Sequence, residues 1–183
     1  MDSRKVVFLD RDGVINRRAQ SHCYITVWEE VEILPGVYEA ICKLKKAGYY
    51  IAVVSNQRGI ARGICSREQI DRLHEKMLEN FKRKGAVIDK IYICPHGEGE
   101  CSCRKPNPGL LYMAEVDLWN EKKERVDKKS SWMIGDFESD IEAGHAYGVK
   151  TIWIRDSENK MQINTDYKAK SLYEAVEVIL QNK

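Results

Sequence analysis

Four groups of polar residues follow short apolar runs in this sequence, and their residue types suit phosphoryl chemistry. They are Asp10-Arg11-Asp12-Gly13, Ser55-Asn56-Gln57, Arg104-Lys105-Pro106, and Gly135-Asp136 with Asp140. Carboxylate oxygens are preferred ligands of Mg²⁺, so Asp10, Asp12 and Asp136 form a candidate magnesium site. Ser55 and Lys105 add donors that neutralise a phosphoryl group during transfer. One carboxylate is then available to attack phosphorus while another transfers protons.

A second cluster has the composition of a zinc site. Its members fall within ten positions and are Cys94, His96, Cys101 and Cys103. A Cys₃His set suits tetrahedral Zn²⁺, and Gly97 and Gly99 permit a tight return between the two pairs. Because four protein ligands close such a site, we expect a structural zinc that holds the loop before Lys105; the alternative is a metal-free reduced loop. The scattered cysteines are interpreted as small buried or half-buried side chains: Cys23, Cys42 and Cys65.

Short apolar runs alternate with amphipathic stretches along the chain. The expected strands are residues 5–9, 49–54, 87–93, 131–134 and 150–154, of which 150–154 is the final core strand. The expected helices are residues 36–47, 66–85, 108–116, 139–147 and 171–180, with a capping box from Ser66 to Gln69. The charged stretch 122–129 is interpreted as a solvated connector.

This alternation predicts an α/β fold, a Rossmann-like parallel sheet with helices on both faces. Ligands of such sheets bind outside the carboxyl ends of the strands, where all four polar groups lie. A turn at Gly13 lets Asp10 and Asp12 face one crevice. The connections leave no room for a separate cap domain, so we expect a single domain, residues 1–183. Loops 16–34 and 57–65 and the cysteine-rich loop must then select the substrate.

Composition limits the classes of function. The chain has 183 residues, of which 43% are apolar and 32% charged, with a net charge of +2. This favours one folded domain, and the near-neutral charge provides no global field for nucleic acid. The apolar runs are far shorter than the roughly 20 residues of a membrane span, and the N-terminus lacks the apolar region of a signal peptide. We expect a cytoplasmic monomer without nucleic-acid or membrane partners.

Taken in order, the four polar groups resemble the motifs of the haloacid dehalogenase superfamily phosphatases, and the match covers about residues 5–155. The resemblance implies a Mg²⁺-dependent phosphatase in which Asp10 is the nucleophile and Asp12 the general acid/base. Asp10, the main-chain carbonyl of Asp12, and Asp136 would bind Mg²⁺. Ser55 and Lys105 would hold the phosphoryl oxygens, and Asp140 would orient these groups rather than bind metal.

Three longer stretches of the sequence narrow the resemblance to particular phosphatase families. They are Asp10 to Asn16, Ser55 to Gly63, and Cys94 to Gly109. These stretches are most similar to the D,D-heptose 1,7-bisphosphate phosphatases, and next to the histidinol-phosphate phosphatases. The first resemblance implies removal of the 7-phosphate of D-glycero-D-manno-heptose 1,7-bisphosphate in nucleotide-activated heptose biosynthesis, and it leaves the anomer open. The residues expected to contact this small phosphorylated sugar are Arg18, Tyr24, Asn56, Gln57, Arg58 and Arg104. His22 is a lesser candidate in the same loop as Tyr24.

Three features depart from the heptose pattern: the zinc loop is short, as in the histidinol type, Phe137 stands where several members carry Lys, and Val14 replaces a frequent Thr. Histidinol phosphate is therefore the alternative substrate. Two alternatives of other classes are a zinc-stabilised binding module without activity and a nucleic-acid end phosphatase. The intact Asp10 and Asp12 count against the first, and the near-neutral charge with no basic, aromatic stripe counts against the second.

Overall fold

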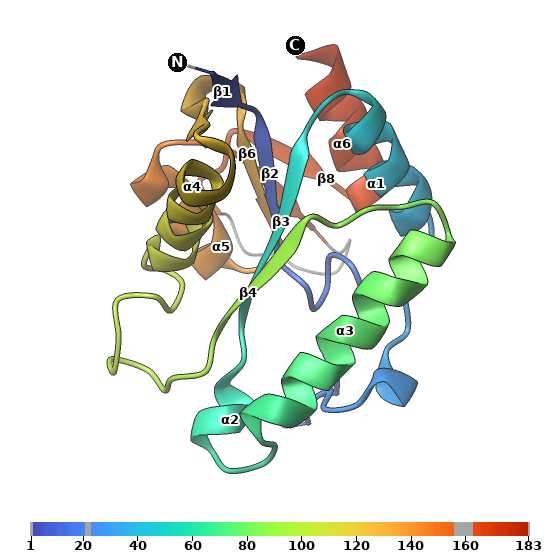
Figure 1. The fold of residues 1–183 in the computed structure, drawn as a ribbon, viewed down its shortest axis with the longest axis vertical. Coiled ribbons are helices and arrows are strands. Elements are labelled where there is room, and N and C mark those ends of the chain that lie inside the picture. The colour runs from blue at the N-terminus through green and yellow to red at the C-terminus, as the bar shows by residue number, and fades with distance from the viewer. Residues whose placement is uncertain (1, 21–22, 156–162, 183) are drawn as a thin grey trace.

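A six-stranded, all-parallel sheet forms the centre of the computed structural model, which describes residues 2–20, 23–155 and 163–182. In spatial order its strands are β4 (Lys90–Cys94), β3 (Tyr50–Asn56), β2 (Val6–Leu9), β6 (Trp132–Gly135), β7 (Lys150–Ile154) and β8 (Tyr167–Ala169). Helices cover both faces of the sheet (Figure 1). The expected Rossmann-like α/β fold is therefore confirmed.

The strands separate two apolar cores because successive side chains point to opposite faces of the sheet. The first core packs against α1 (Val37–Lys46), α3 (Arg67–Arg83) and α6 (Leu172–Gln181), and the second against α4 (Gly109–Lys122) and α5 (Glu138–Tyr147). In β2, Val7 and Leu9 enter the first core, whereas Val6 and Phe8 enter the second. All four side chains are fully buried, so the strand that leads to Asp10 is fixed on both faces.

Most elements agree with expectation, and the capping box of Ser66 and Gln69 begins α3 as predicted. Residues 150–154 are not the final core strand, however, because β8 pairs with β7 beyond them. The stretch 122–129 is not a simple solvated connector either. Within it β5 (Arg125–Val126) pairs with β1 (Ser3–Arg4), and Val126 is buried. β5 and β1 have two residues each, which is too short for an alternating apolar pattern in the sequence.

Besides α1 and α3, the described connections after β2 and β3 contain only short helical segments. The described part of the first connection contains the 3₁₀ turn Trp28–Glu30, and the second contains α2 (Arg58–Ala61) and α3. A further 3₁₀ turn, Lys128–Ser130, precedes β6. The described residues form no second sheet over the carboxyl ends of the strands, as expected for a fold without a cap domain. No helix among them is long and apolar enough to cross a membrane.

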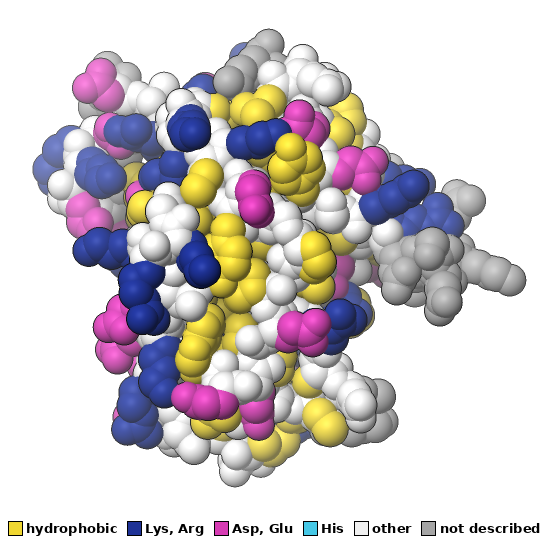
Figure 2. All heavy atoms as spheres, turned by 90° about the vertical axis from the view of Figure 1, so that its right-hand side faces the viewer, with side chains coloured by type: hydrophobic (Ala, Val, Ile, Leu, Met, Phe, Trp, Pro, Cys, Tyr) yellow, Lys and Arg dark blue, Asp and Glu magenta, His cyan; other side chains and the backbone are white. Residues whose placement is uncertain are grey.

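The face on the right of Figure 1 mixes apolar and charged side chains. Figure 2 shows this face, where a band of hydrophobic side chains runs between Lys, Arg, Asp and Glu. Both cationic and anionic side chains are present on it. Helices α3 and α1 carry ion pairs, Lys76 with Glu29 and Lys43 with Glu177. The coloured side chains of this face therefore carry charges of both signs.

Candidate active site

The polar groups that follow the strands converge on one cavity of about 450 Å³. Asp10 follows β2, Ser55 is the penultimate residue of β3, and Asp140 lies in the first turn of α5 after β6. The residues that line the cavity include Asp10, Asp12, Arg18, Tyr24, Ser55, Asn56, Gln57, Arg104, Lys105 and Asp140. Gly13 has a φ of +94°, and a side chain there would collide with Asp136. The turn predicted at Gly13 thus brings Asp10 and Asp12 to the same cavity.

Lys105 is buried between two carboxylates. Its Nζ lies 2.6 Å from Oδ1 of Asp10 and 2.6 Å from Oδ1 of Asp140, and it donates to the carbonyl of Val54 at 2.7 Å. Burial disfavours the ammonium, but the two carboxylates outweigh it and raise the Lys105 pKa. Burial raises the pKa of Asp10 to about 8, against the opposing effect of Lys105. The site therefore carries more buried negative charge than Lys105 alone neutralises.

Asp136 has the free oxygen that a metal site requires. Its Oδ2 lies 2.5 Å from Nη2 of Arg18, whereas its Oδ1 is buried without a hydrogen-bond partner. Burial raises the pKa of Asp136 to about 6, although Arg18 opposes this. Carboxylate oxygens of Asp10, Asp136 and Asp140 lie within 4.8 Å of one another. This set of hard oxygen donors, with Asp10 and Asp140 buried and Asp136 half-buried, fits Mg²⁺.

Asp140 differs from the other two carboxylates because protein donors engage both of its oxygens. Oδ1 pairs with Lys105, and Oδ2 accepts from the backbone N–H groups of Asp136 and Phe137 at 3.1 and 3.0 Å. Gly135 leaves room for this contact, since a side chain there would overlap Asp140. Asp140 thereby fixes both Lys105 and the loop that carries Asp136.

Asp12 is held by a dense set of donors. Arg11 contacts both carboxylate oxygens through Nε and Nη2 at 2.8–3.2 Å, and Asn16 Nδ2 donates to Oδ1 at 2.9 Å. Gln57 Nε2 adds a longer contact of 3.4 Å. Burial disfavours the ionised form, but Arg11 and these hydrogen bonds outweigh it and hold the pKa of Asp12 below its usual range.

The residues expected to contact substrate have different surroundings. The side-chain amide of Asn56 bonds the backbone carbonyl and N–H of Lys105 at 3.0 and 3.1 Å, so it fixes the loop that carries this lysine. Gln57 donates to Ser55 Oγ at 2.8 Å. Tyr24 lines the cavity and accepts from Arg62 through its hydroxyl oxygen. Residues of the loops, held by these contacts, thus form the wall of the cavity.

Arg104 and Arg58 occupy unequal positions at the entrance. Arg104 lines the cavity, and its Nη1 reaches only the backbone carbonyl of His96, at 3.5 Å. Arg58 lies beside the cavity lining and pairs with Glu98, which does line the cavity, at 2.6 Å. Arg104 therefore contributes directly to the cavity lining, whereas Arg58 reaches the cavity only through Glu98.

Some lining residues were not named as substrate contacts from the sequence. Ala19, Cys23, Ile25 and Glu98 lie in loops that were expected to select the substrate, whereas Arg11, Phe137 and Ser139 lie outside those loops. Arg11 had a usable signal, because it stands between two motif carboxylates. Cys23 is exposed, so the expectation that it is buried or half-buried was wrong; its side chain lines the cavity, whereas Ile25 of the same loop enters the core. Phe137 stacks on Arg18, whose guanidinium carbon lies 3.7 Å from the ring centre. His22 lies outside the described residues.

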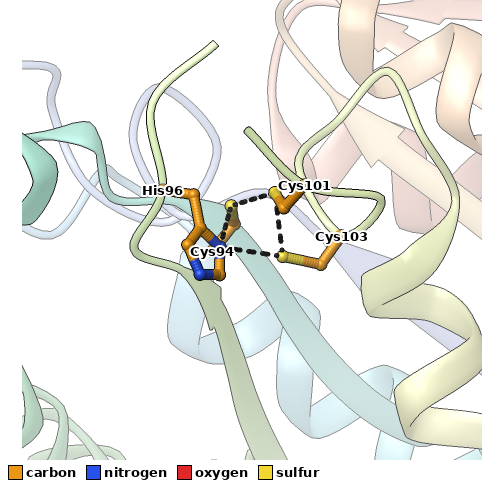
Figure 3. A group of neighbouring side chains, drawn as sticks. All are labelled: Cys94, His96, Cys101 and Cys103. Carbon is orange, nitrogen blue, oxygen red and sulfur yellow. Dashed lines mark hydrogen bonds between the residues drawn. The ribbon is translucent and has the colours of Figure 1, made fainter. Parts of the chain in front are cut away.

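The cysteine-rich loop brings its four predicted ligands together (Figure 3). Cys94 Sγ lies 3.5 Å from Cys101 Sγ and 3.7 Å from His96 Nδ1, and Cys103 Sγ lies 3.3 and 3.4 Å from the same two atoms. A tetrahedral zinc site with Zn–S bonds of about 2.3 Å has edges of about 3.8 Å. The four side chains therefore have nearly the separation and the chemistry that Zn²⁺ requires.

Comparisons with known proteins agree with this geometry. A family model described as HAD-hydrolase-like matches residues 102–175. A D-glycero-beta-D-manno-heptose-1,7-bisphosphate 7-phosphatase of Vibrio cholerae is 41% identical over 157 residues, covering 81% of this chain and 80% of that protein. A D-glycero-alpha-D-manno-heptose-1,7-bisphosphate 7-phosphatase of Burkholderia mallei is 41% identical over 155 residues, covering 80% and 77%.

A solved structure extends the likeness to the whole fold. The D,D-heptose 1,7-bisphosphate phosphatase of B. bronchiseptica, complexed with magnesium and phosphate, superposes with a TM-score of 0.82 at 28% identity. The match covers 98% of this chain and 99% of that one. For each of the two sequence relatives, the match covers more than two thirds of this chain and more than two thirds of the relative, at 41% identity. The chain therefore belongs to the heptose-1,7-bisphosphate 7-phosphatase family of haloacid dehalogenase-like hydrolases.

Proposed function

We propose that this chain is a Mg²⁺-dependent phosphatase that removes the 7-phosphate of D-glycero-D-manno-heptose 1,7-bisphosphate. The observation that carries the proposal is the group formed by buried Asp10 and Lys105 and half-buried Asp136, in which one Asp136 oxygen has no protein partner. Asp10 and Lys105 line the cavity at the carboxyl ends of the strands. The names of the relatives supply the substrate class.

The first half of the reaction transfers the phosphoryl group to Asp10. A carboxylate oxygen of Asp10 attacks phosphorus and the bond from phosphorus to the sugar oxygen breaks. Asp12 gives that oxygen a proton, so Asp12 must be protonated at this stage although Arg11 lowers its pKa in the free site. Asp10, Asp136 and the Asp12 carbonyl would hold Mg²⁺, which when bound neutralises charge on the phosphoryl group. Lys105 and Ser55 provide further donors for the phosphoryl oxygens.

The second half returns the enzyme to its starting state. Asp12, now a carboxylate, removes a proton from water as the water oxygen attacks the aspartyl phosphate. The bond between phosphorus and Asp10 breaks, inorganic phosphate leaves, and Asp12 is protonated again. The two steps use one carboxylate as nucleophile and the other as acid and then base.

The distant phosphate of a bisphosphate needs a cation at the cavity entrance. Arg104 lines the cavity and has only one long backbone contact there, so its guanidinium is available to grip phosphate bidentately. The imidazole and ammonium of histidinol phosphate would be repelled by this cation. Arg104 thus favours an anionic distal group.

We also propose that the Cys₃His cluster binds one structural Zn²⁺. The cluster lies in the segment that leads directly to Arg104 and Lys105. Four protein ligands leave no open position for a reacting molecule. The zinc would therefore act by fixing the loop from which both cations project.

The test compares purified enzyme on heptose 1,7-bisphosphate and histidinol phosphate with Mg²⁺ present. We expect kcat/KM to favour the bisphosphate at least about tenfold, which corresponds to ~1.4 kcal/mol of transition-state binding. Asp10→Asn is the control for the mechanism and should have no turnover, since an amide is a poor nucleophile. Arg104→Ala should lower kcat/KM for the bisphosphate more than for a simple monophosphate ester.

The outcomes test the substrate, the aspartyl-phosphate mechanism and the class of phosphatase separately. A preference for histidinol phosphate would overturn the substrate while leaving the phosphatase in place. Folded Asp10→Asn protein with near wild-type turnover would exclude the aspartyl phosphate. Activity on 3′-phosphorylated DNA instead of either small molecule would favour the nucleic-acid end phosphatase.

A further inference from the structure

Arg11 is buried beside the active site although it belongs to none of the roles assigned above. Only 1% of its surface is exposed. Its Nε and Nη2 both face the Asp12 carboxylate, and each lies within 2.8–3.2 Å of the two oxygens. A forked contact of this kind fixes the plane of the carboxylate as well as its position.

The opposite side of this guanidinium meets a histidine on α3. Arg11 Nη1 lies 3.0 Å from His74 Nε2, and His74 is 6% exposed. A guanidinium only donates hydrogen bonds, so Nε2 accepts, and the ring is neutral with its proton on Nδ1. Burial and the charge of Arg11 both lower the pKa of His74, to about 3, in agreement with a neutral ring.

Gln57, which lies between β3 and α2, completes the network. Its Oε1 lies 3.4 Å from Arg11 Nη2, and its Nε2 donates to Ser55 Oγ at 2.8 Å. The guanidinium is therefore held by Asp12, His74 and Gln57 at once. His74 holds the guanidinium edge that faces away from Asp12, so it limits rotation and withdrawal of the fork.

We propose that Arg11, held in place by His74, is a positioning residue that keeps the Asp12 carboxylate in the orientation from which it transfers protons. The inference rests on the proposed function, because it assigns a role within that reaction. Arg11 and His74 neither gain nor lose a proton in it. Through His74, helix α3 acts on the acid/base although it carries no residue of the four polar groups.

Two substitutions of His74 separate positioning from packing. His74→Leu fills the space but removes the acceptor, whereas His74→Gln offers an Oε1 near the position of Nε2. With heptose 1,7-bisphosphate we expect His74→Leu to lower kcat about tenfold or more, with KM within about twofold, because proton transfer is impaired and binding is not. His74→Gln should recover most of kcat.

A substrate with an activated leaving group provides a second readout. 2,4-Dinitrophenyl phosphate needs no proton to release its phenolate, so the first step no longer depends on Asp12 as an acid. His74→Leu should keep the burst of dinitrophenolate and lose rate only in the steady-state phase, where Asp12 acts as a base on water. Arg11→Lys, which keeps the charge but loses the fork, should behave in the same way.

Met77→Ala on the same helix is the matched control. Met77 is fully buried in the core and contacts none of the network by hydrogen bonds, so its variant should melt earlier with unchanged kcat. Equal kcat in wild type and His74→Leu, no recovery in His74→Gln, or equal loss of burst and steady-state rate would overturn the inference alone. A wild-type protein without any phosphatase activity would overturn the proposed function with it.

Discussion

Lys105 depends strongly on its neighbours because its ammonium is buried with two carboxylates. The side chain is 2% exposed, and those of Asp10 and Asp140 are 9% and 2% exposed. Buried ions are tolerated only when they are paired, and removal of one partner leaves the others without compensation. The same ammonium thus serves stability and phosphate binding.

Replacement of Lys105 should therefore lower both the stability of the fold and the phosphatase activity. We expect Lys105→Met to abolish phosphatase activity and to lower the free energy of unfolding by about 3 kcal/mol, since two buried carboxylates lose their cation. Urea titration followed by circular dichroism measures the second effect. Lys129→Met, at an exposed lysine, should stay within about 0.5 kcal/mol of wild type. A Lys105→Met protein of wild-type stability would contradict the pairing.

At the scale of residues, the sequence predicted which groups come together but not how each is held. Asp10, Ser55 and Lys105 were identifiable because each follows a strand or a fixed motif. The contact between Arg11 and His74 spans 63 positions. Nothing local in the sequence marks such a pair, since it exists only after α3 has packed near the carboxyl ends of the strands.

The cysteine-rich loop is an element whose shape depends on its ligands. It follows β4 and ends where Arg104 and Lys105 begin, with turns in place of regular hydrogen bonding over much of its length. A loop of this kind has little apolar surface to bury. Metal bonds therefore contribute directly to its folding free energy.

Zinc content and stability should fall together. We expect one zinc per chain in protein purified without chelator, and loss of zinc with a lower melting temperature in Cys101→Ser and Cys103→Ser. Cys42→Ser, outside the cluster, is the matched control and should keep its zinc. Elemental analysis without zinc, or equal melting temperatures with and without metal, would count against the proposed site.

Strand β8 is attached to β7 by a side chain as well as by backbone pairing. Asp166 Oδ2 accepts from Thr151 N at 2.8 Å and from Thr151 Oγ1 at 2.9 Å. Burial disfavours the carboxylate, but the bonds from Thr151 outweigh it and lower the Asp166 pKa. A carboxyl with a depressed folded-state pKa adds stability above its unfolded pKa and loses it as pH falls through the folded value.

The contribution of Asp166 should accordingly depend on pH. We expect Asp166→Asn to lower the free energy of unfolding by about 1 kcal/mol at neutral pH. The difference from wild type should be full above the unfolded pKa of about 3.9 and shrink as pH falls below it through the depressed folded-state pKa, where wild-type Asp166 becomes protonated. Urea titrations at several pH values measure it, with Glu142→Gln on the exposed side of α5 as control. A difference that is constant with pH would rule out the carboxylate as its source.

Elements were predictable in proportion to their length and periodicity. The capping box and apolar face of α3 were sufficient to locate that helix. β8 spans only Tyr167–Ala169 and β5 only Arg125–Val126, which is too short for an alternating pattern. Both strands form because a partner strand offers free backbone groups, and that is tertiary information.

The two ends of the chain meet in one core at the scale of the whole molecule. Val7 of β2, Ile41 of α1 and Val176 of α6 belong to the same buried cluster. Leu172, Val176 and Ile179 of α6 are at most 2% exposed. Burial of three such side chains contributes roughly 5 kcal/mol, comparable to the total stability of about 5–15 kcal/mol of a typical domain.

Residues 1–183 should therefore unfold as one domain. We expect circular dichroism and tryptophan fluorescence to report a single coincident transition. A chain that ends at residue 155 lacks β8 and α6, exposes the apolar face of α1, and should not unfold cooperatively. A chain that ends at residue 181 keeps all of α6 and is the matched control. Two separated transitions, or a cooperative and active chain without α6, would show that the core is divided and that its C-terminal part is dispensable.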